Sequence, residues 1–159
     1  MKGKRWLALL AAAALVLALA AVGSARQNVS YQVYAQMTVN EEVPAPKHPS
    51  LLAGNFGGVI QGGQGGVFNG ILGYVLRPGI RKYTVVAAHI HHAMRGKVGP
   101  VVLTLCSGNC PAGAKTLQFA VSSRLLGWMR AGQTYANVHT KDNPAGELRG
   151  QIGVGKPLG

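Results

Sequence analysis

Residues 83–91 read Tyr-Thr-Val-Val-Ala-Ala-His-Ile-His, and no other stretch of this 159-residue chain indicates a β-strand more strongly. β-Branched and aromatic residues favour strands, and successive side chains of a strand point to opposite faces. The alternation therefore predicts a strand with two imidazoles on one side. One face would hold Tyr83, Val85, Ala87, His89 and His91, and the other Val86, Ala88, Ile90 and His92.

The rest of the chain shows the same pattern of short apolar runs separated by turn residues. Strands are predicted at 31–39, 55–60, 67–76, 101–106, 116–121, 134–140 and 147–154. Residues 122–132 leave room for one helical turn, and no long helical period occurs elsewhere after residue 25. These features predict an all-β fold, an antiparallel β-sandwich or barrel of roughly 7–9 short strands with little helix.

The first 25 residues differ in composition from the rest. Three basic residues among the first five precede an apolar run at 6–22, which ends before Gly23-Ser24-Ala25. This order is typical of a secretory signal peptide. We therefore predict a signal peptide at 1–25, a secreted or periplasmic location, and a single β domain at 26–159. Alternatively the run stays as an anchor, although it is at the short limit of the about 17–25 residues that span a bilayer.

Charge is strongly unbalanced, with 16 Lys and Arg against four Asp and Glu. We expect this basic surface chiefly to keep an exported protein solvated, and the alternative is weak attraction to an anionic envelope polymer. The basic residues are scattered, without the interleaved aromatics of single-strand binders, so nucleic acid is not expected as a partner. Few carboxylates and no nucleophile-elbow serine disfavour a hydrolase. No second long apolar run follows the signal, so no membrane span is expected after its removal.

The two cysteines, Cys106 and Cys110, stand in the sequence Cys-Ser-Gly-Asn-Cys. In an exported chain a pair this close is typical of a disulfide. Closing so small a loop removes little chain entropy. The bridge is therefore expected to fix a turn rather than to hold the fold together.

Histidines offer the best candidates for chemistry. His89 and His91 would project from one face of a strand about 7 Å apart. His139, on another predicted strand, would supply a third nitrogen, and neutral imidazoles suit copper or zinc. Alternatively the histidines are structural, with His89 hydrogen-bonded to the loop at 95–100 and His139 capping the turn at 142–146.

Three further residues are candidates for the surroundings of such a metal ion. Glu147 would be a fourth ligand or a partner of the ligands, and Asn137 and Arg149 would lie in the second shell. His92 is expected to point away, because it belongs to the opposite face of its strand.

Several motifs occur in a fixed order along the chain. They are Glu42-Val-Pro44, Ala88-His-Ile-His91, Gly99-Pro-Val-Val-Leu-Thr-Leu105, Gly132-Gln-Thr-Tyr-Ala-Asn-Val-His-Thr140 and Pro144-Ala-Gly-Glu-Leu-Arg-Gly-Gln-Ile152. In this order the chain resembles the CHRD domain, a family named from chordin, over roughly residues 31–153. The family usually has a glycine after its His-x-His, where this chain has His92, so the local turn is expected to differ.

The resemblance implies a β domain but transfers no catalytic residues. In animals, the CHRD copies of chordin belong to an extracellular antagonist of bone morphogenetic proteins, and single-domain microbial members are exported. The motif positions of the family fall here on His89, His91, Gly99, Pro100, Tyr135, Asn137, His139, Thr140, Gly146, Glu147, Arg149 and Gly150.

A His-x-His strand in an exported β-sandwich also looks like copper-zinc superoxide dismutase. The bimetallic site of that enzyme needs around six histidines and an aspartate. This chain has five histidines and one aspartate, so the full site cannot be built. A single ion on His89, His91 and His139 remains, with Arg149 nearby to steer an anion.

Three functional hypotheses follow. The leading one is an exported, non-catalytic CHRD-like binding module whose ligand is a protein or an envelope polymer. The alternative is a mononuclear copper or zinc protein, a carrier or a superoxide-dismutase-like redox enzyme, that uses His89, His91 and His139. In the third, the histidines have a structural role, and the basic surface binds an anionic polymer.

Overall fold

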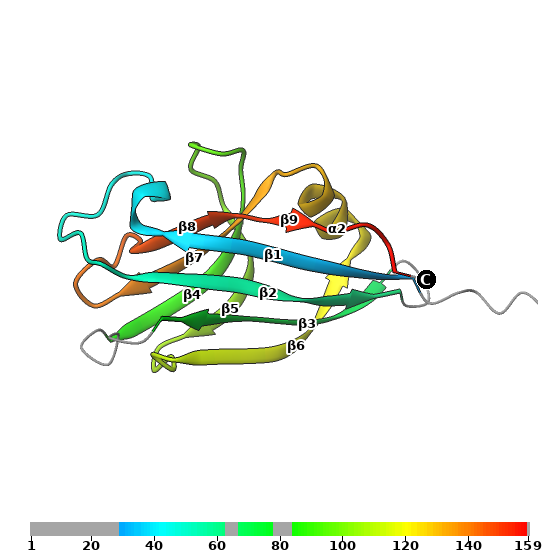
Figure 1. The fold of residues 1–159 in the computed structure, drawn as a ribbon, viewed down its shortest axis with the longest axis horizontal. Helices are drawn as coiled ribbons and strands as arrows, with labels where there is room; N and C mark the ends of the chain where they lie inside the picture. The colour runs from blue at the N-terminus through cyan, green and yellow to red at the C-terminus, as the bar shows by residue number, and fades with distance from the viewer. Residues whose placement is uncertain (1–28, 63–66, 78–83, 159) are drawn as a thin grey trace, which may run out of the picture.

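The computed structural model describes residues 29–62, 67–77 and 84–158, in which nine β-strands form one curved sheet (Figure 1). The strand order is β5-β4-β7-β8-β1-β2-β3-β6, with β9 beside β1. The strands are β1 Ser30–Thr38, β2 Ala53–Gln61, β3 Val67–Leu76, β4 Val85–His92, β5 Val101–Ser107, β6 Ala114–Ser122, β7 Thr134–Thr140, β8 Leu148–Gln151 and β9 Gly153–Val154. A short 3-10 helix, η1, spans Val39–Glu41.

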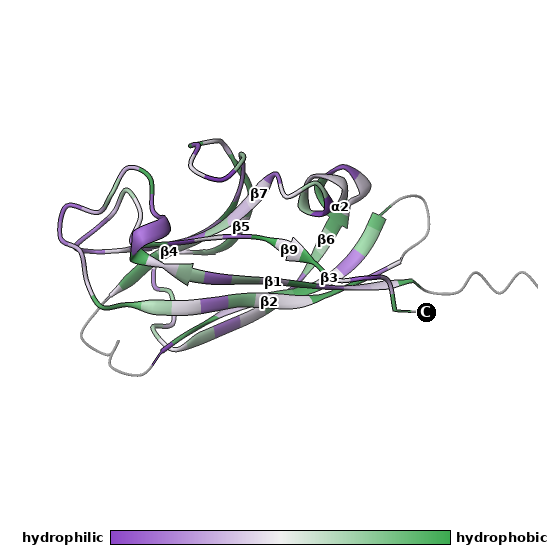
Figure 2. Ribbon diagram, turned by 45° about the horizontal axis from the view of Figure 1, so that its top comes forward, coloured by the Kyte–Doolittle hydropathy of each residue, from purple (hydrophilic) through white to green (hydrophobic). Residues whose placement is uncertain are grey.

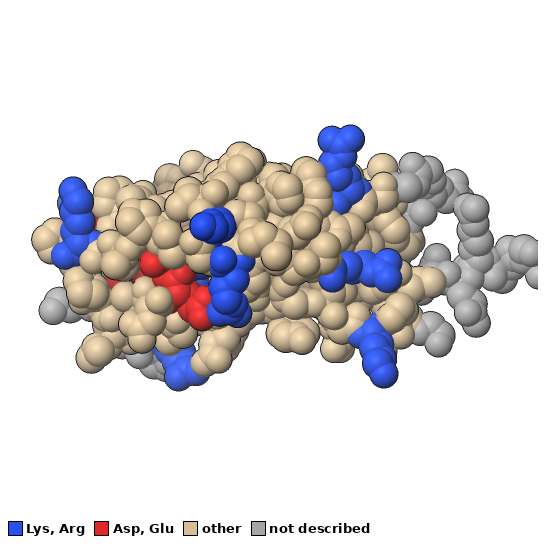
Figure 3. All heavy atoms as spheres, turned by 90° about the horizontal axis from the view of Figure 1, so that it is seen from above, with Lys and Arg blue, Asp and Glu red and all other residues tan. Residues whose placement is uncertain are grey.

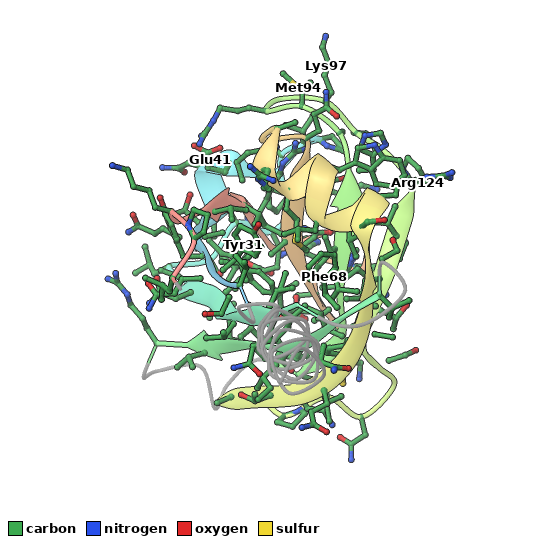
Figure 4. The ribbon with its side chains drawn as sticks, turned by 90° about the vertical axis from the view of Figure 1, so that its right-hand side faces the viewer. Tyr31, Glu41, Phe68, Met94, Lys97 and Arg124 are labelled. Atoms are coloured by element: carbon green, nitrogen blue, oxygen red, sulfur yellow. A yellow bond between two sulfur atoms is a disulfide. The ribbon has the colours of Figure 1, made fainter. Side chains whose placement is uncertain are left out.

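The sheet curls on itself so that two layers enclose the core. β1, β2, β3 and β6 form the layer nearest the viewer in Figure 1, and β8, β7, β4 and β5 lie behind it. A view along the strands shows them arranged around a ring, close to a barrel (Figure 4). The pairings are antiparallel. The predicted all-β, antiparallel fold with little helix is confirmed.

Alternation along β1 shows why these segments form strands. Val33, Ala35 and Met37 are buried, while Gln32 and Tyr34 between them are exposed. Bands of apolar and polar residues follow one another along β1 and β2 in Figure 2. One face of each strand therefore supplies the core, and the hydrophobic effect on that face fixes the register.

The phase of β4 differs from the prediction at its start. Sequence alternation places Val85 on the histidine face, but the structure buries Val85 in the core together with Ile90. The register against β7 shifts between Val85 and Ala87. An extra residue at such a bulge reverses the side to which the following residues point. Beyond the bulge the predicted alternation holds, and His89 and His91 share a face.

The region predicted to hold one helical turn forms a helix of two turns, α2 (Ser123–Arg130). The hydroxyl of Ser122 accepts a hydrogen bond from the Leu125 amide, which satisfies one free N–H at the helix start. The helix covers one end of the barrel, and its Trp128 stacks on His92 with ring centroids 4.0 Å apart. His92 thus lies on the face of β4 opposite to His89 and His91, as alternation predicts.

The strand predicted at 147–154 is interrupted. It forms β8 and β9, with Ile152 between them buried in the core. The Ile152 amide donates to the Thr134 carbonyl, and β9 then pairs with β1 rather than with β7. The chain thereby changes partner strands, which period-two alternation does not reveal.

The disulfide is the observation that bears on the predicted export. Cys106 and Cys110 form the predicted disulfide, which closes the turn between β5 and β6. Among the residues that the structure describes, no helix is long and apolar enough to cross a membrane. The predicted signal peptide at 1–25 lies outside the described residues.

Candidate metal centre

His89, His91 and His139 come together on two neighbouring strands. β4 supplies His89 and His91, and β7 supplies His139 from a register in which it pairs with Ala87. One nitrogen from each ring lies within 4.8 Å of the others. Nδ1 of His89 and Nε2 of His139 are 3.2 Å apart.

Backbone carbonyls fix the orientation of two of these rings. Nδ1 of His91 donates to the Gly99 carbonyl at 2.9 Å, and Nδ1 of His139 donates to the Pro144 carbonyl at 3.0 Å. A carbonyl only accepts, so each Nδ1 carries the proton, and Nε2 of the neutral ring keeps its lone pair. The loop at 95–100 is thus held by His91 and not by His89, whereas His139 caps the turn at 142–146.

Burial favours the neutral form of all three imidazoles. It lowers the pKa of His89 to about 4, with the neighbouring His139 and His91 adding to the effect. Burial also lowers the pKa of His91 and of His139, against the opposing effect of their carbonyl hydrogen bonds. Near neutral pH the three rings therefore offer lone pairs rather than positive charges.

Gly99 allows the loop that holds His91 to approach β4 closely. A Cβ at this position would lie 1.9 Å from the carbonyl oxygen of His92, much closer than atoms in contact can be. The His92 amide also donates to the Pro100 carbonyl at 3.0 Å. The close approach at Gly99 is what brings its carbonyl within reach of His91.

Behind His91 lies a stack of two further side chains. The Tyr135 ring is parallel to the His91 ring with centroids 4.8 Å apart, and the Arg149 guanidinium lies 3.6 Å from the centre of the Tyr135 ring. Arg149 is only 1% exposed, and its Nη2 donates to the Met94 carbonyl. A buried guanidinium cannot reach an anion in solvent. It acts here as a cation–π partner that supports Tyr135 and, through it, His91.

The buried carboxyl group of Glu42 lies beside this stack. Glu42 follows η1, and its carboxylate accepts hydrogen bonds from the Asn137 side chain and the Val43 amide. Burial raises the pKa of Glu42 to about 7, despite these hydrogen bonds and the nearby Arg149. Gly146 packs directly on this carboxylate, since a Cβ there would lie 2.6 Å from Cδ of Glu42.

Glu147 does not join the histidines and instead anchors the turn beside them. Its carboxylate is fully buried and accepts hydrogen bonds from Ser50, Thr140 and Asn143. These bonds fix the turn at 142–146, whose Pro144 carbonyl orients His139. Glu147 therefore acts on the histidine cluster through the backbone of this turn.

The arrangement coincides with the part of the chain that a known family shares. The pattern of the CHRD domain matches residues 33–152, which is most of the chain. The chain belongs to the CHRD domain family. No curated protein and no solved structure matches it. The three histidines, Tyr135, Arg149 and the Glu147 turn all lie within the CHRD match, so the resemblance seen in the motifs is confirmed at the level of the family.

Two features of this candidate site could not be predicted from the sequence. The stacking of Tyr135 on His91 joins β7 to β4, and no spacing in the sequence shows it. Glu42 lies in the first half of the chain, far from the histidines in sequence, and reaches Asn137 only in the fold. The scarcity of acidic residues is a usable signal, because two of the four, Glu42 and Glu147, are buried.

Proposed function

We propose that this CHRD domain is a metal-binding module that holds one copper or zinc ion between His89, His91 and His139. The observation that carries the proposal is the paired orientation of His91 and His139, each tied by Nδ1–H to a backbone carbonyl. Histidines that bind metals almost always donate their other ring N–H in this way. Nε2 of His91 is buried and makes no other hydrogen bond within the described residues.

The spacing of the donor atoms supports the same proposal. With metal–nitrogen bonds of about 2.0–2.1 Å, two ligand nitrogens in a tetrahedral or trigonal site lie roughly 3.3–3.6 Å apart. The pair from His89 and His139 is at 3.2 Å, and the whole cluster is within 4.8 Å. A shift of about 1 Å in one ring, well within side-chain mobility, would complete a three-nitrogen site.

Accepting an ion requires one rearrangement of a proton. His139 already has its proton on Nδ1, so its Nε2 can only accept. The 3.2 Å contact between the two rings is therefore a hydrogen bond from Nδ1–H of His89 to Nε2 of His139. An ion would replace this hydrogen bond if His89 moved its proton to Nε2. Since that move changes the tautomer and not the charge, it needs no release of a proton near neutral pH.

The module would work outside the cytoplasm. The Cys106–Cys110 disulfide supports this part of the proposal, because such bonds persist in oxidising compartments. Imidazole nitrogens serve both zinc and copper, so the same site suits a carrier or a redox centre. Membership of the CHRD family supports a binding module acting on a protein or an envelope polymer, with the ion as its inorganic ligand.

We expect the purified protein to bind about one equivalent of Zn²⁺ or Cu²⁺, and a His89→Ala/His91→Ala variant to bind none at this site. The reason is that two of the three nitrogens are lost. Metal content after equilibration and desalting, together with a competition titration against a chromophoric chelator, measures both proteins.

The control is His92→Ala, which removes an imidazole from the same strand without touching the cluster, because His92 stacks on Trp128. This variant should bind the ion as the unchanged protein does. Equal and negligible metal in the unchanged protein and in the double variant would rule out the proposal.

A second candidate function, attachment to an anionic envelope polymer, is favoured by the distribution of charge. Lys and Arg side chains are spread over the face seen in Figure 3, while Asp and Glu gather in one small area.

We expect binding to a polyanion such as teichoic acid or heparin to weaken at least tenfold between 50 and 500 mM NaCl, because salt screens exposed charges. Sedimentation with immobilised polymer measures it, and binding that is insensitive to salt would contradict it.

A further inference from the structure

One outer face of the barrel is almost free of charge. Of all the residues in β1, β2, β3 and β6, only Lys115 is charged. Lys115 pairs with Tyr74, whose ring is buried, so its side chain starts on the inner side of the sheet. This neutral face, defined by the outward residues of β1, β2, β3 and β6, is the layer that faces the viewer in Figure 1. In a chain with 16 basic residues, a four-stranded face without charge stands apart from the rest of the surface.

The neutral face also presents apolar side chains to solvent. Tyr34 is 61% exposed on β1, and Ile71 and Val75 are 49% and 55% exposed on β3. The other outward positions of these strands are mostly uncharged amides, hydroxyls and small residues, among them Gln32, Gln36, Asn55, Gln61, Asn69, Thr116, Gln118 and Ala120. The exposed apolar side chains are thus spaced among uncharged polar ones, and the face as a whole lacks the charges that cover the rest of the surface.

A hollow of about 550 Å³ lies within the neutral face, and side chains from β2, β3 and β6 line it. Ile71 of β3 is among the residues that line it. Tyr34 lies two strands away from Ile71, and its ring extends over Gly153 of β9. The neutral face therefore offers a depression beside the outward side chains of β3, and across a two-fold axis each copy presents the same surface to the other.

Charge indicates what covers this face. Two copies of a strongly basic chain repel each other wherever their Lys and Arg side chains meet. A broad surface whose outward positions carry no described charge, such as the neutral face, avoids that repulsion. A polyanion, in contrast, would be drawn to the basic surface elsewhere and not to this face.

The size of the face is sufficient for a pair. Four strands at about 4.8 Å spacing and nine residues at about 3.3 Å each cover roughly 600 Å². A pair of such faces would bury roughly 1,200 Å², at the lower end of stable protein interfaces. A modest, concentration-dependent association is therefore what the area allows.

We propose that the neutral face is a homodimer interface on which a second copy of this chain packs, sheet against sheet, around a two-fold axis. The axis passes through the neutral face, so that Ile71 and Val75 of each copy lie within the interface. The metal site is not part of this interface, because the histidine cluster belongs to β4 and β7 in the other layer. The inference is independent of the proposed metal binding.

Sedimentation equilibrium of the purified protein with a chelator present tests the interface, since the chelator removes pairs bridged by metal ions. We expect a monomer–dimer equilibrium that Ile71→Lys weakens at least tenfold, because each introduced ammonium group would be buried in the interface. Val75→Lys is a second variant of the same face. Val101→Lys is the control, since Val101 is 47% exposed on β5 in the other layer.

Salt gives a second readout with a defined sign. Raising NaCl from 20 to 500 mM should strengthen the dimer, because it screens the repulsion between two basic copies. A monomer at every concentration up to about 1 mM and at both salt concentrations would overturn the proposal. So would a dimer that weakens with salt, or one that Val101→Lys breaks while Ile71→Lys and Val75→Lys leave it intact, which would indicate pairing at a sheet edge.

Discussion

Replacing Glu147 with alanine is expected to lower the free energy of unfolding by about 3–5 kcal/mol. The buried carboxylate accepts hydrogen bonds from Ser50, Thr140 and Asn143. Each buried donor left without an acceptor costs about 1–3 kcal/mol, and the removed side chain also leaves a void. Urea unfolding followed by tryptophan fluorescence measures the change.

The effect should extend to the histidine cluster. Without the carboxylate the turn at 142–146 loses its anchor, and the Pro144 carbonyl no longer holds Nδ1 of His139 in one orientation. Metal affinity is therefore expected to fall together with stability, although Glu147 is not a ligand. Loss of a group that orients a metal-binding histidine without touching the ion typically reduces metal affinity about 10–100-fold.

Glu41→Ala provides the matched control for Glu147→Ala. This variant also loses a carboxylate, but the carboxylate of Glu41 pairs with the exposed Arg95 at the surface. An exposed ion pair of this kind contributes about 0–1 kcal/mol, so the stability should hardly change. A Glu147→Ala variant within 1 kcal/mol of the unchanged protein would show that the buried cluster does not anchor the fold.

Glu147 is hard to interpret from the sequence because one of its hydrogen-bond partners is distant along the chain. Local patterns of period two predict the all-β fold class and the shared face of His89 and His91. Turn residues predict the turn at 142–146. The role of Glu147 depends instead on Ser50, 97 positions away, which only the tertiary fold brings to it. Sequence reasoning could therefore place Glu147 near the site but not assign its partners.

The same distinction holds within β4. Alternation predicts the direction of each side chain only as long as the strand has no bulge, and the register shift after Val85 moves that residue into the core. The partner of the 95–100 loop is a related case. The sequence leads us to expect His89 to hold this loop, but the close approach of Gly99 places its carbonyl beside His91 instead.

Between pH 7.5 and 5, the free energy of unfolding of the metal-free protein is expected to fall as the solution becomes more acidic. Burial lowers the pKa of His89 to about 4 and also lowers the pKa of His91 and His139. In the unfolded chain these histidines take up protons near the ordinary value of about 6.5. Below that pH the unfolded state binds more protons than the folded state, so acid favours unfolding.

Glu42 acts in the opposite direction and must be separated from the histidines. Its pKa is raised to about 7, so the folded state takes up this proton before the unfolded state does, and acid stabilises the fold through Glu42 down to its ordinary value. Three histidines have a lowered pKa, and one carboxyl group has a raised pKa. Below pH 6.5 the free energy of unfolding should therefore fall with acid, as the histidines require.

Two substitutions isolate these contributions. Glu42→Gln removes the opposing carboxyl group, so the loss of stability between pH 7.5 and 5 should be steeper than in the unchanged protein. His89→Asn removes one of the three bases, so the loss should be shallower, by up to about 1.4 kcal/mol per pH unit for each proton no longer taken up on unfolding. Urea unfolding at closely spaced pH values with a chelator present measures the slopes. If His89→Asn left the slope unchanged, the imidazoles would not be held neutral by the fold, and the argument that they offer lone pairs to an ion near neutral pH would lose its basis.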